Sequence, residues 1–305
     1  MRITFIKTIE RVALKDETIF LLTADLGFKL FDSFRRAHPG RFVNVGVAEA
    51  NMIGIAAGLA LSGKNVYCYS IAPFLTMRCL EQIRIDLCYQ NLNVKLLGIG
   101  GGLAYGLEGV THHAVEDLAI MRSLPNMTVV APGDKREAEA LANESVRYQG
   151  PLYIRLSKEE KSQVHKTTPR LKIGKGFIVK KGVGLTIITA GSLLFTSKAV
   201  SDILESKNVK TTLISMHTIK PLDTKLLKRC LKTSKAIFTI EEHSIVGGLG
   251  SAVAEVLLES GYKGIFRRLG LPDRYGPYIG KTEYLRKKYR LTPKAIANSI
   301  LRVLT

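Results

Sequence analysis

Residues 41–63, RFVNVGVAEANMIGIAAGLALSG, decide how this sequence folds. The apolar run 41–47 predicts a buried strand, and residues 48–63 predict an apolar helix that Gly63 ends. Glu49 therefore opens the helix directly after the strand. A carboxylate in this position either caps the helix and interacts with its positive end, or is a functional buried acid. Taken alone, the motif favours the capping interpretation.

The alternation of strand and helix continues on both sides of this stretch. In the first half the expected strands are 17–25, 41–47, 65–71, 93–100, 127–132 and 151–157, and the expected helices are 2–13, 48–63, 72–90, 113–124 and 134–148. A second unit has expected strands at 184–191, 209–216, 235–243 and 264–272 and expected helices at 197–206, 223–233, 251–260 and 292–304. Such alternation predicts an α/β protein with mainly parallel sheets covered on both faces.

A Lys-rich, weakly patterned segment separates the two units, and we interpret most of it as an interdomain linker. The predicted organisation is a first domain at residues 1–160, a linker at 161–182 and a second domain at 183–305.

The charge of the chain is large and unevenly placed. The 305 residues are 46% hydrophobic and 23% charged, which excludes a disordered or fibrous protein, and the formal net charge is +19. Residues 1–155 hold 17 basic and 15 acidic side chains, whereas residues 156–305 hold 28 and 11. This asymmetry suggests nucleic acid, a membrane surface, an acidic protein or a phosphorylated substrate as partner.

The four cysteines form no C-x-x-C pair and no zinc-ligand spacing, which favours buried, reduced thiols. No apolar run approaches the length that spans a bilayer, and the N-terminal residues lack the apolar core of a signal peptide. We therefore expect a soluble, cytoplasmic protein.

A glycine-rich loop follows the expected strand 93–100. Residues 98–113, GIGGGLAYGLEGVTHH, contain six glycines, which suit close approach of the backbone to a ligand. They do not form a dinucleotide-binding fingerprint. His112 and His113 lack further ligands at metal-binding spacing, so a ligand-contacting histidine at the carboxyl end of a strand is the more natural interpretation. For Phe74, taken alone, core packing is the better interpretation.

The order of the motifs resembles one family. The segments ADLG (24–27), NVGVAEANMIGIAAGLA (44–60), YSIAPF (69–74), GVTHH (109–113), MRSLPNM (121–127) and PLYIRL (151–156) resemble the pyrimidine-binding domain of transketolases. The segments ITAGS (188–192) and EEHSIVGGLGSAVAE (241–255) are similar to the transketolase C-terminal domain. The resemblance extends over essentially the whole chain.

The resemblance implies a role for individual residues. Glu49 matches the catalytic glutamate that hydrogen-bonds the aminopyrimidine ring of thiamine diphosphate and so promotes removal of the thiazolium C2 proton. Phe74 matches an aromatic ring that stacks on the pyrimidine, and Asp25 an acid near the cofactor and the subunit interface. His112 matches a catalytic histidine that contacts the substrate, and Arg155 an arginine that reaches the sugar phosphate.

Several positions depart from the family pattern, and these are Ala50, Met77, Leu80, Gly100, Glu108 and Val110. Glu108 stands where classical transketolases have an aspartate that contacts a substrate hydroxyl, so Glu108 is a candidate substrate-binding residue. The departures spare the cofactor chemistry and leave the sugar specificity open.

The sequence contains no G-D-G motif, with which complete transketolases bind Mg²⁺ and the cofactor diphosphate. The resemblance therefore implies a C-terminal, β-type subunit that pairs with a separate N-terminal subunit carrying the Mg²⁺ ligands, in a heterotetramer that also self-associates through the family interface. No metal ligand is expected in this chain, and neither nucleic acid nor a membrane is an expected partner. We assign the excess positive charge to surface solvation and to docking of an acidic subunit.

Three alternatives remain open. A 2-oxoacid dehydrogenase β-subunit and a deoxyxylulose-phosphate synthase share the architecture or several motifs. A non-catalytic, basic interaction module with the same fold is the third. Direct nucleic-acid binding is a separate and still weaker rival, which predicts tight, salt-dependent binding to duplex or single strands.

Overall fold

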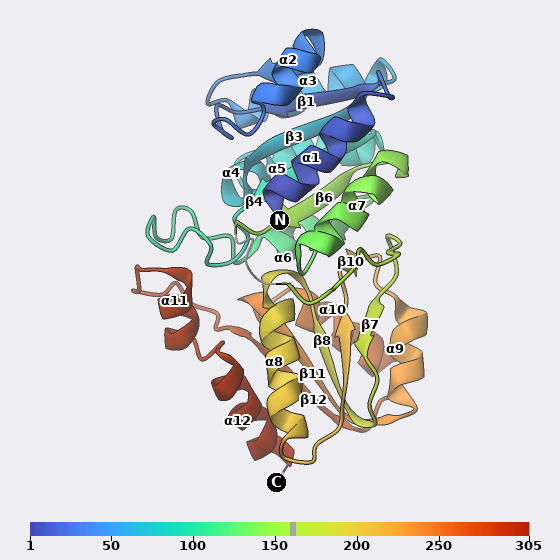
Figure 1. Ribbon diagram of the computed structural model, residues 1–305, viewed down its shortest axis with the longest axis vertical. Helices are drawn as coiled ribbons and strands as arrows, with labels where there is room; N and C mark the ends of the chain where they lie inside the picture. Colours follow the sequence, from blue (N-terminus) through green and yellow to red (C-terminus); the bar gives the residue numbers. More distant parts are fainter. Residues whose placement is uncertain (159–162, 305) are drawn as a thin grey trace.

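The protein, described here from a computed structural model at residues 1–158 and 163–304, contains two sheets one above the other (Figure 1). The first has the strand order β10-β5-β6-β4-β3-β1-β2 and the second the order β12-β11-β8-β9-β7. Within the described residues the predicted fold class, two mainly parallel-sheet α/β domains, is confirmed. The predicted domain end at 160 and linker start at 161 lie outside the described residues.

The first sheet is parallel except at one edge. Its strands are β1 (Ile19–Thr23), β2 (Phe42–Asn44), β3 (Asn65–Ile71), β4 (Val94–Ile99), β5 (Thr128–Val130), β6 (Leu152–Leu156) and β10 (Thr218–Lys220). Strand β10, which the sequence pattern does not predict, comes from the second half of the chain and pairs antiparallel with β5.

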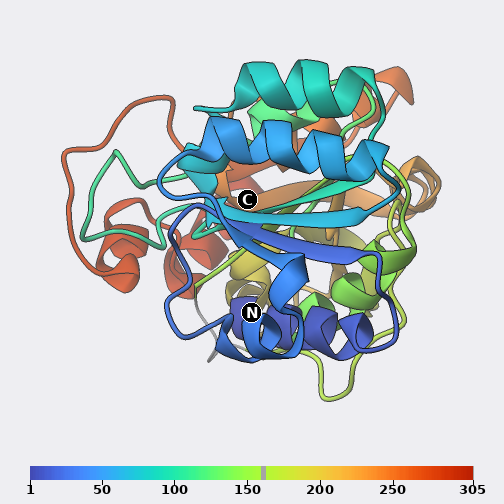
Figure 2. The same cartoon turned by 90° about the horizontal axis from the view of Figure 1, so that it is seen from above.

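Helices cover both faces of the first sheet (Figure 2). One face carries α1 (Arg2–Ala13), α2 (Asp32–Ala37) and α7 (Lys135–Arg147), and the other carries α3 (Glu49–Leu61), α4 (Ala72–Thr76), α5 (Leu80–Gln82), the π-helix η2 (Ile83–Tyr89) and α6 (Asp117–Ser123). The longer helices bury apolar side chains against the sheet, as α1 does with Phe5, Ile6 and Ile9.

The helix expected at 72–90 is interrupted. Helix α4 ends at Thr76, and Cys79 has a non-helical backbone with φ −107° before the chain resumes in α5 and η2. The interruption places Arg78 between two helical segments, where its side chain reaches Glu49 in α3.

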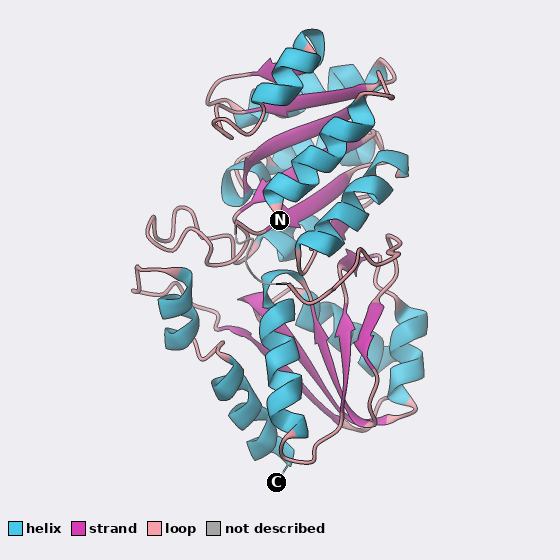
Figure 3. Cartoon of the chain, viewed as in Figure 1, coloured by secondary structure: helices cyan, strands magenta, loops and turns pink. Residues whose placement is uncertain are grey.

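The second sheet contains β7 (Phe177–Lys180), β8 (Gly184–Thr189), β9 (Thr211–Ser215), β11 (Ser234–Ser244) and β12 (Ile265–Leu271). Helices α8 (Leu194–Glu205), α9 (Thr224–Leu231), α10 (Leu249–Glu259), α11 (Thr282–Lys288) and α12 (Pro293–Leu304) surround it (Figure 3). Strand β7 pairs antiparallel with β9, so residues 177–180 of the predicted linker are part of the second sheet.

The apolar core is continuous between the two domains. One cluster of buried residues includes Leu22 and Leu96 of the first sheet together with Ile188 and Ile214 of the second. The four cysteines are buried and free, as the sequence predicts. In the described part of the chain, no helix has the length and apolar character needed to cross a membrane.

Candidate active site

Glu49 is buried at the start of α3, with 2% of the residue exposed. Its Oε1 atom accepts a hydrogen bond from Ser70 Oγ at the end of β3 (3.0 Å), and Oε2 accepts one from Arg78 Nη1 (2.8 Å). Helix α3 has Ala48 as its N-cap and no side-chain cap. The geometry therefore fits a functional buried acid better than a helix cap.

Flat side chains are stacked next to this carboxylate. The guanidinium of Arg78 lies over the Phe74 ring, with its central carbon 4.6 Å from the ring centroid. The Phe74 and His112 rings meet edge to face, with centroids 5.0 Å apart. Three of the residues that the sequence singles out, Glu49, Phe74 and His112, are thus brought together from three separate segments.

Tyr105 extends this group along the glycine-rich loop. Its ring centroid lies 5.9 Å from that of His112, and Lys158 Nζ lies 4.6 Å from the Tyr105 centroid. Gly100 has φ +80°, and a Cβ atom there would be 2.1 Å from the Tyr105 ring, so this ring position requires glycine. We call Phe74, His112 and Tyr105 the aromatic row, which has Glu49 at one end and Lys158 at the other.

Asp25 lies outside these contacts. It adopts φ 53° in the turn after β1 and accepts a hydrogen bond from Asn44 Nδ2 (3.0 Å), while its own N–H donates to Asn44 Oδ1 (2.9 Å). Asp25 and Asn44 line an open depression of about 330 Å³ that also includes Phe28, which is 92% exposed. The structure therefore places Asp25 in a depression separate from the aromatic row.

Arg155 is buried at the end of β6 rather than in an open site. Its Nε atom donates to Asp117 Oδ2 (2.9 Å), and its Nη2 atom donates to the carbonyls of Ala114 (2.6 Å) and Glu242 (3.0 Å). Burial is the largest single effect on Arg155 and opposes its charge, but Asp117, Tyr153 and Glu242 together outweigh burial and raise the pKa of the guanidinium. These contacts commit Arg155 to the protein interior, so the predicted phosphate contact stays a prediction.

Glu108 and Lys158 share a surface depression of about 280 Å³, which Lys281 and Thr282 of the second domain also line. Both Glu108 and Lys158 are exposed. Because Lys158 also contacts Tyr105, this depression adjoins one end of the aromatic row.

His113 does not continue the aromatic row. It is 9% exposed, burial lowers its pKa, and its Nε2 atom has no hydrogen-bond partner among the described residues. Across residues 1–158 and 163–304, no group of three His, Cys, Asp or Glu side chains could hold a metal ion.

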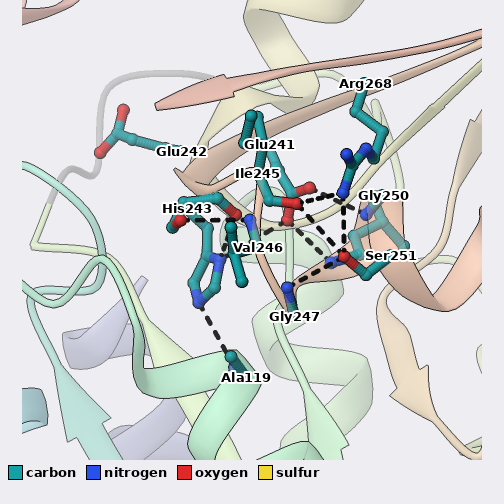
Figure 4. Close-up of polar contacts among 12 residues, drawn as sticks. Ala119, Glu241, Glu242, His243, Ile245, Val246, Gly247, Gly250, Ser251 and Arg268 are labelled. Atoms are coloured by element: carbon teal, nitrogen blue, oxygen red, sulfur yellow. Dashed lines mark hydrogen bonds and ion pairs between the residues drawn. The ribbon is translucent and has the colours of Figure 1, made fainter. Parts of the chain in front are cut away.

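Strand β11 carries buried polar side chains, of which His243 contacts the first domain (Figure 4). Glu241 accepts hydrogen bonds from two backbone N–H groups at the start of α10 (2.7 and 2.8 Å), and burial raises its pKa to about 7 against the effect of these bonds. His243 Nδ1 donates to the Ser244 carbonyl (2.7 Å), and Nε2 accepts from the N–H of Ala119 in α6 (3.3 Å). Burial lowers the pKa of His243 to about 4, so the imidazole is neutral and serves as an acceptor between the domains.

Comparison with known families assigns both domains. The family "Transketolase, pyrimidine binding domain" matches residues 1–162, and "Transketolase, C-terminal domain" matches residues 174–296. The chain belongs to the transketolase family. The predicted resemblance is thereby confirmed for both halves of this transketolase chain.

Individual relatives match almost the whole chain. The "Putative transketolase C-terminal section" of Methanocaldococcus jannaschii is 37% identical over 304 residues, which cover 99% of this chain and 95% of that protein. The "6-deoxy-6-sulfo-D-fructose transketolase subunit SqwH" of Clostridium sp. (strain MSTE9) is 35% identical over 300 residues, covering 98% and 92%. A solved structure, "Split gene transketolase, inactive beta4 tetramer", superposes with a TM-score of 0.88 at 36% identity and covers 99% of this chain and 96% of its own. The transketolase chain thus matches the separately encoded C-terminal sections of split transketolases.

Sequence reasoning missed four side chains of the site, namely Ser70, Arg78, Tyr105 and Lys158. Arg78 follows Phe74 by four residues, which would place the two side chains on one face of the helix expected at 72–90, and this was the available signal. Ser70 depends on the packing of α3 beside β3, Tyr105 on the path of the glycine-rich loop, and Lys158 on where the chain leaves β6. The spacing of residues reveals none of these.

The Glu49 and Phe74 side chains fit an aminopyrimidine ring. The Arg78 guanidinium already shows that the pair accepts a flat group that donates N–H to the carboxylate and stacks on the phenyl ring. An aminopyrimidine ring is also flat and also carries N–H groups, so Glu49 and Phe74 suit the cofactor that the family implies, thiamine diphosphate.

Proposed function

We propose that this chain is the C-terminal, β-type subunit of a thiamine diphosphate-dependent transketolase that transfers a two-carbon ketol unit between phosphorylated sugars. The observation that carries the proposal is the buried Glu49 carboxylate beside the Phe74 ring, with a planar N–H donor held by both.

Glu49 and Phe74 are the cofactor-binding pair of the proposal. When bound, thiamine diphosphate supplies a nucleophilic carbon and an electron sink for cleavage of the bond next to a ketone. Glu49 accepts a hydrogen bond from the pyrimidine ring and thereby favours one tautomer of that ring. Phe74 stacks on the ring. The buried apolar side chains of α3, among them Met52 and Ile53, keep water away from this pair.

The substrate is proposed to lie along the aromatic row. His112, between Phe74 and Tyr105, contacts the substrate hydroxyls and the reacting carbon atoms, and its Nδ1 atom is oriented by Thr111 Oγ1 (2.9 Å). Glu108 contacts a further hydroxyl. Lys158 takes the phosphate contact that the family resemblance assigns to Arg155, because Asp117 and two carbonyls engage the Arg155 guanidinium.

A separate N-terminal subunit is proposed to supply the Mg²⁺ and diphosphate ligands, since this sequence has no G-D-G motif. Two copies of each subunit would form a heterotetramer. Asp25 and the exposed Phe28 line the depression that we assign to the subunit interface near the cofactor. The net charge of +19 favours an acidic partner surface.

The test is reconstitution with the N-terminal transketolase subunit of the same source. Thiamine diphosphate with Mg²⁺ is titrated calorimetrically into each subunit and into the mixture, and turnover is assayed with a ketose phosphate and with a 2-oxoacid as donor. We expect binding and ketose-phosphate turnover only in the mixture. Full activity of the lone chain would contradict the two-subunit arrangement.

The same experiment separates the alternatives. Turnover with the 2-oxoacid alone assigns the chain to the dehydrogenase or deoxyxylulose-phosphate synthase class. A mixture that binds no cofactor makes the chain a non-catalytic module, for which salt-dependent binding to duplex or single-stranded nucleic acid is then measured.

A further inference from the structure

A buried carboxylate of the second domain, Glu242, contacts the glycine-rich loop (residues 100–113). Glu242, at the end of β11, is 1% exposed. Its Oε1 atom accepts a hydrogen bond from the Leu103 N–H (3.0 Å), and its Oε2 atom pairs with Arg286 Nε of α11. The Glu242 side chain points away from Glu241 and His243 (Figure 4), as the alternation of side chains along a strand requires.

The segment that leads into α11 supports the loop from a second side. The N–H of Gly280 donates to the Gly106 carbonyl (3.0 Å), and Thr282 Oγ1 donates to the Leu103 carbonyl (3.3 Å). Figures 1 and 2 both show the loop and this segment running side by side at one edge of the molecule. Leu103 therefore has both its N–H and its carbonyl bound by the second domain.

Two glycines of the loop are explained by these contacts. Gly102 has φ +71°, and a Cβ atom there would lie 2.4 Å from Glu242 Oε1. A Cβ atom on Gly106 would lie 2.2 Å from the Gly280 carbonyl oxygen. The loop therefore approaches the second domain as closely as only glycine permits at these positions.

We propose that Glu242 is a positioning residue that fixes the glycine-rich loop and thereby the places of Tyr105, Glu108 and His112. By anchoring Leu103 between β11 and α11, it determines where the loop leaves the sheet and where these three side chains lie. That these three side chains contact the substrate rests on the proposed function. The anchoring itself does not.

A more exposed ion pair between the domains serves as a control for this contact. Arg122 of α6 pairs with Glu255 of α10, so this ion pair also joins the two domains, but neither residue contacts the glycine-rich loop in any bond described here. If weakened contact between the domains were enough to mobilise the loop, Glu255→Ala would mobilise it as well as Glu242→Ala.

The first measurement is amide hydrogen exchange of the chain by mass spectrometry, which needs neither cofactor nor partner. We expect residues 103–113 to exchange roughly tenfold faster in Glu242→Ala, because a buried charge-assisted hydrogen bond is lost, and to be unchanged in Glu255→Ala. Glu242→Gln retains an acceptor for the Leu103 N–H and should fall between the two. Equal exchange of this segment in Glu242→Ala and Glu255→Ala would overturn the proposal.

The second measurement uses the assembled two-subunit enzyme. Glu242→Ala should raise KM for the sugar phosphate roughly tenfold while the dissociation constant for thiamine diphosphate stays the same, since Glu49 and Phe74 lie outside the loop. A parallel loss of cofactor affinity would show general damage and overturn the positioning role. If Glu242→Ala does not fold, Thr282→Val, which removes only the bond to the Leu103 carbonyl, carries both measurements with the same expected directions. An assembled wild-type enzyme without transketolase activity would refute the proposed function, and the exchange result would still decide the anchoring.

Discussion

Arg78 donates a hydrogen bond to the buried Glu49 carboxylate at 2.8 Å, although half of the Arg78 side chain is exposed to solvent. The same guanidinium covers the Phe74 ring. The Arg78 guanidinium thus occupies both Glu49 and Phe74, the proposed cofactor-binding pair.

Replacing Glu49 should remove activity without removing assembly. In the two-subunit enzyme we expect Glu49→Ala to lower kcat at least ~100-fold, because the carboxylate is the proposed proton-directing group of the site. Assembly is measured by gel filtration and turnover with a ketose phosphate. Glu259→Ala, at an exposed position of α10, is the control and should retain both. Retained turnover in Glu49→Ala would remove this residue from the mechanism.

Replacing Arg78 should tighten cofactor binding. The cofactor ring must displace the guanidinium from Glu49 and Phe74, so Arg78→Met removes the competitor and leaves a buried carboxylate in need of a partner. We expect the dissociation constant for thiamine diphosphate in the mixture to fall roughly fivefold to tenfold, measured calorimetrically. Arg84→Met, at an exposed position of η2, should leave it unchanged. Weaker binding in Arg78→Met would make Arg78 a ligand-holding residue instead.

We expect replacement of Arg155 to change the stability of the chain, and replacement of Lys158 to change KM for the sugar phosphate. Arg155→Met leaves Asp117 buried without its cation, which should lower the free energy of unfolding by ~3–5 kcal/mol in urea titrations. Lys158→Met, at an exposed position, should change it by less than ~0.5 kcal/mol. In the assembled enzyme Lys158→Met should instead raise KM for the sugar phosphate roughly tenfold. If Lys158→Met keeps the wild-type KM, Lys158 does not bind the phosphate and Arg155 becomes the candidate again.

His243 should make the stability of the chain depend on pH. Its pKa is about 4 in the folded chain against an ordinary value of 6.5, so between these values the unfolded chain binds more protons. The contribution of the neutral imidazole is therefore complete above pH 6.5 and decreases towards pH 4, by up to ~1.4 kcal/mol per pH unit.

The measurement is urea unfolding of the wild type and of His243→Gln between pH 4.5 and 7.5. The glutamine side chain can accept from the Ala119 N–H and cannot be protonated in this range. Glu241, whose pKa is raised to about 7, acts in the opposite direction. Its Oε2 atom lies 3.9 Å from His243 Nδ1, so the difference between the two curves measures His243 together with its interaction with Glu241. Parallel curves would refute the assignment.

The strand and helix order was predictable because each element carries its own apolar period. Residues 2–13 and 65–71 match α1 and β3 to the residue. Glu49 became a candidate site residue only through the family resemblance, because an acid that begins an apolar helix, taken alone, favours a helix cap. The interruption at Cys79 was not predictable, since residues 72–90 keep a helical spacing of apolar side chains throughout.

The burial of Arg155 was also beyond the sequence. An arginine at the carboxyl end of a parallel strand has the expected position for a ligand contact, and only the packing of α6 shows that Asp117 faces it. Strand β10 is three residues long and was missed because so short a segment has no measurable period.

Because strand β10 belongs to the first sheet but comes from the second half of the chain, the two halves are not independent structural units. It closes the open edge of the first sheet beside β5, and Lys220 at its end donates from Nζ to the carbonyls of Arg122 and Leu124 in the first domain. A fragment cut between the domains would expose the edge of β5 and lose these bonds, which invites pairing with other chains. Because β10 and the apolar core both connect the two domains, we expect the domains to unfold in one cooperative transition.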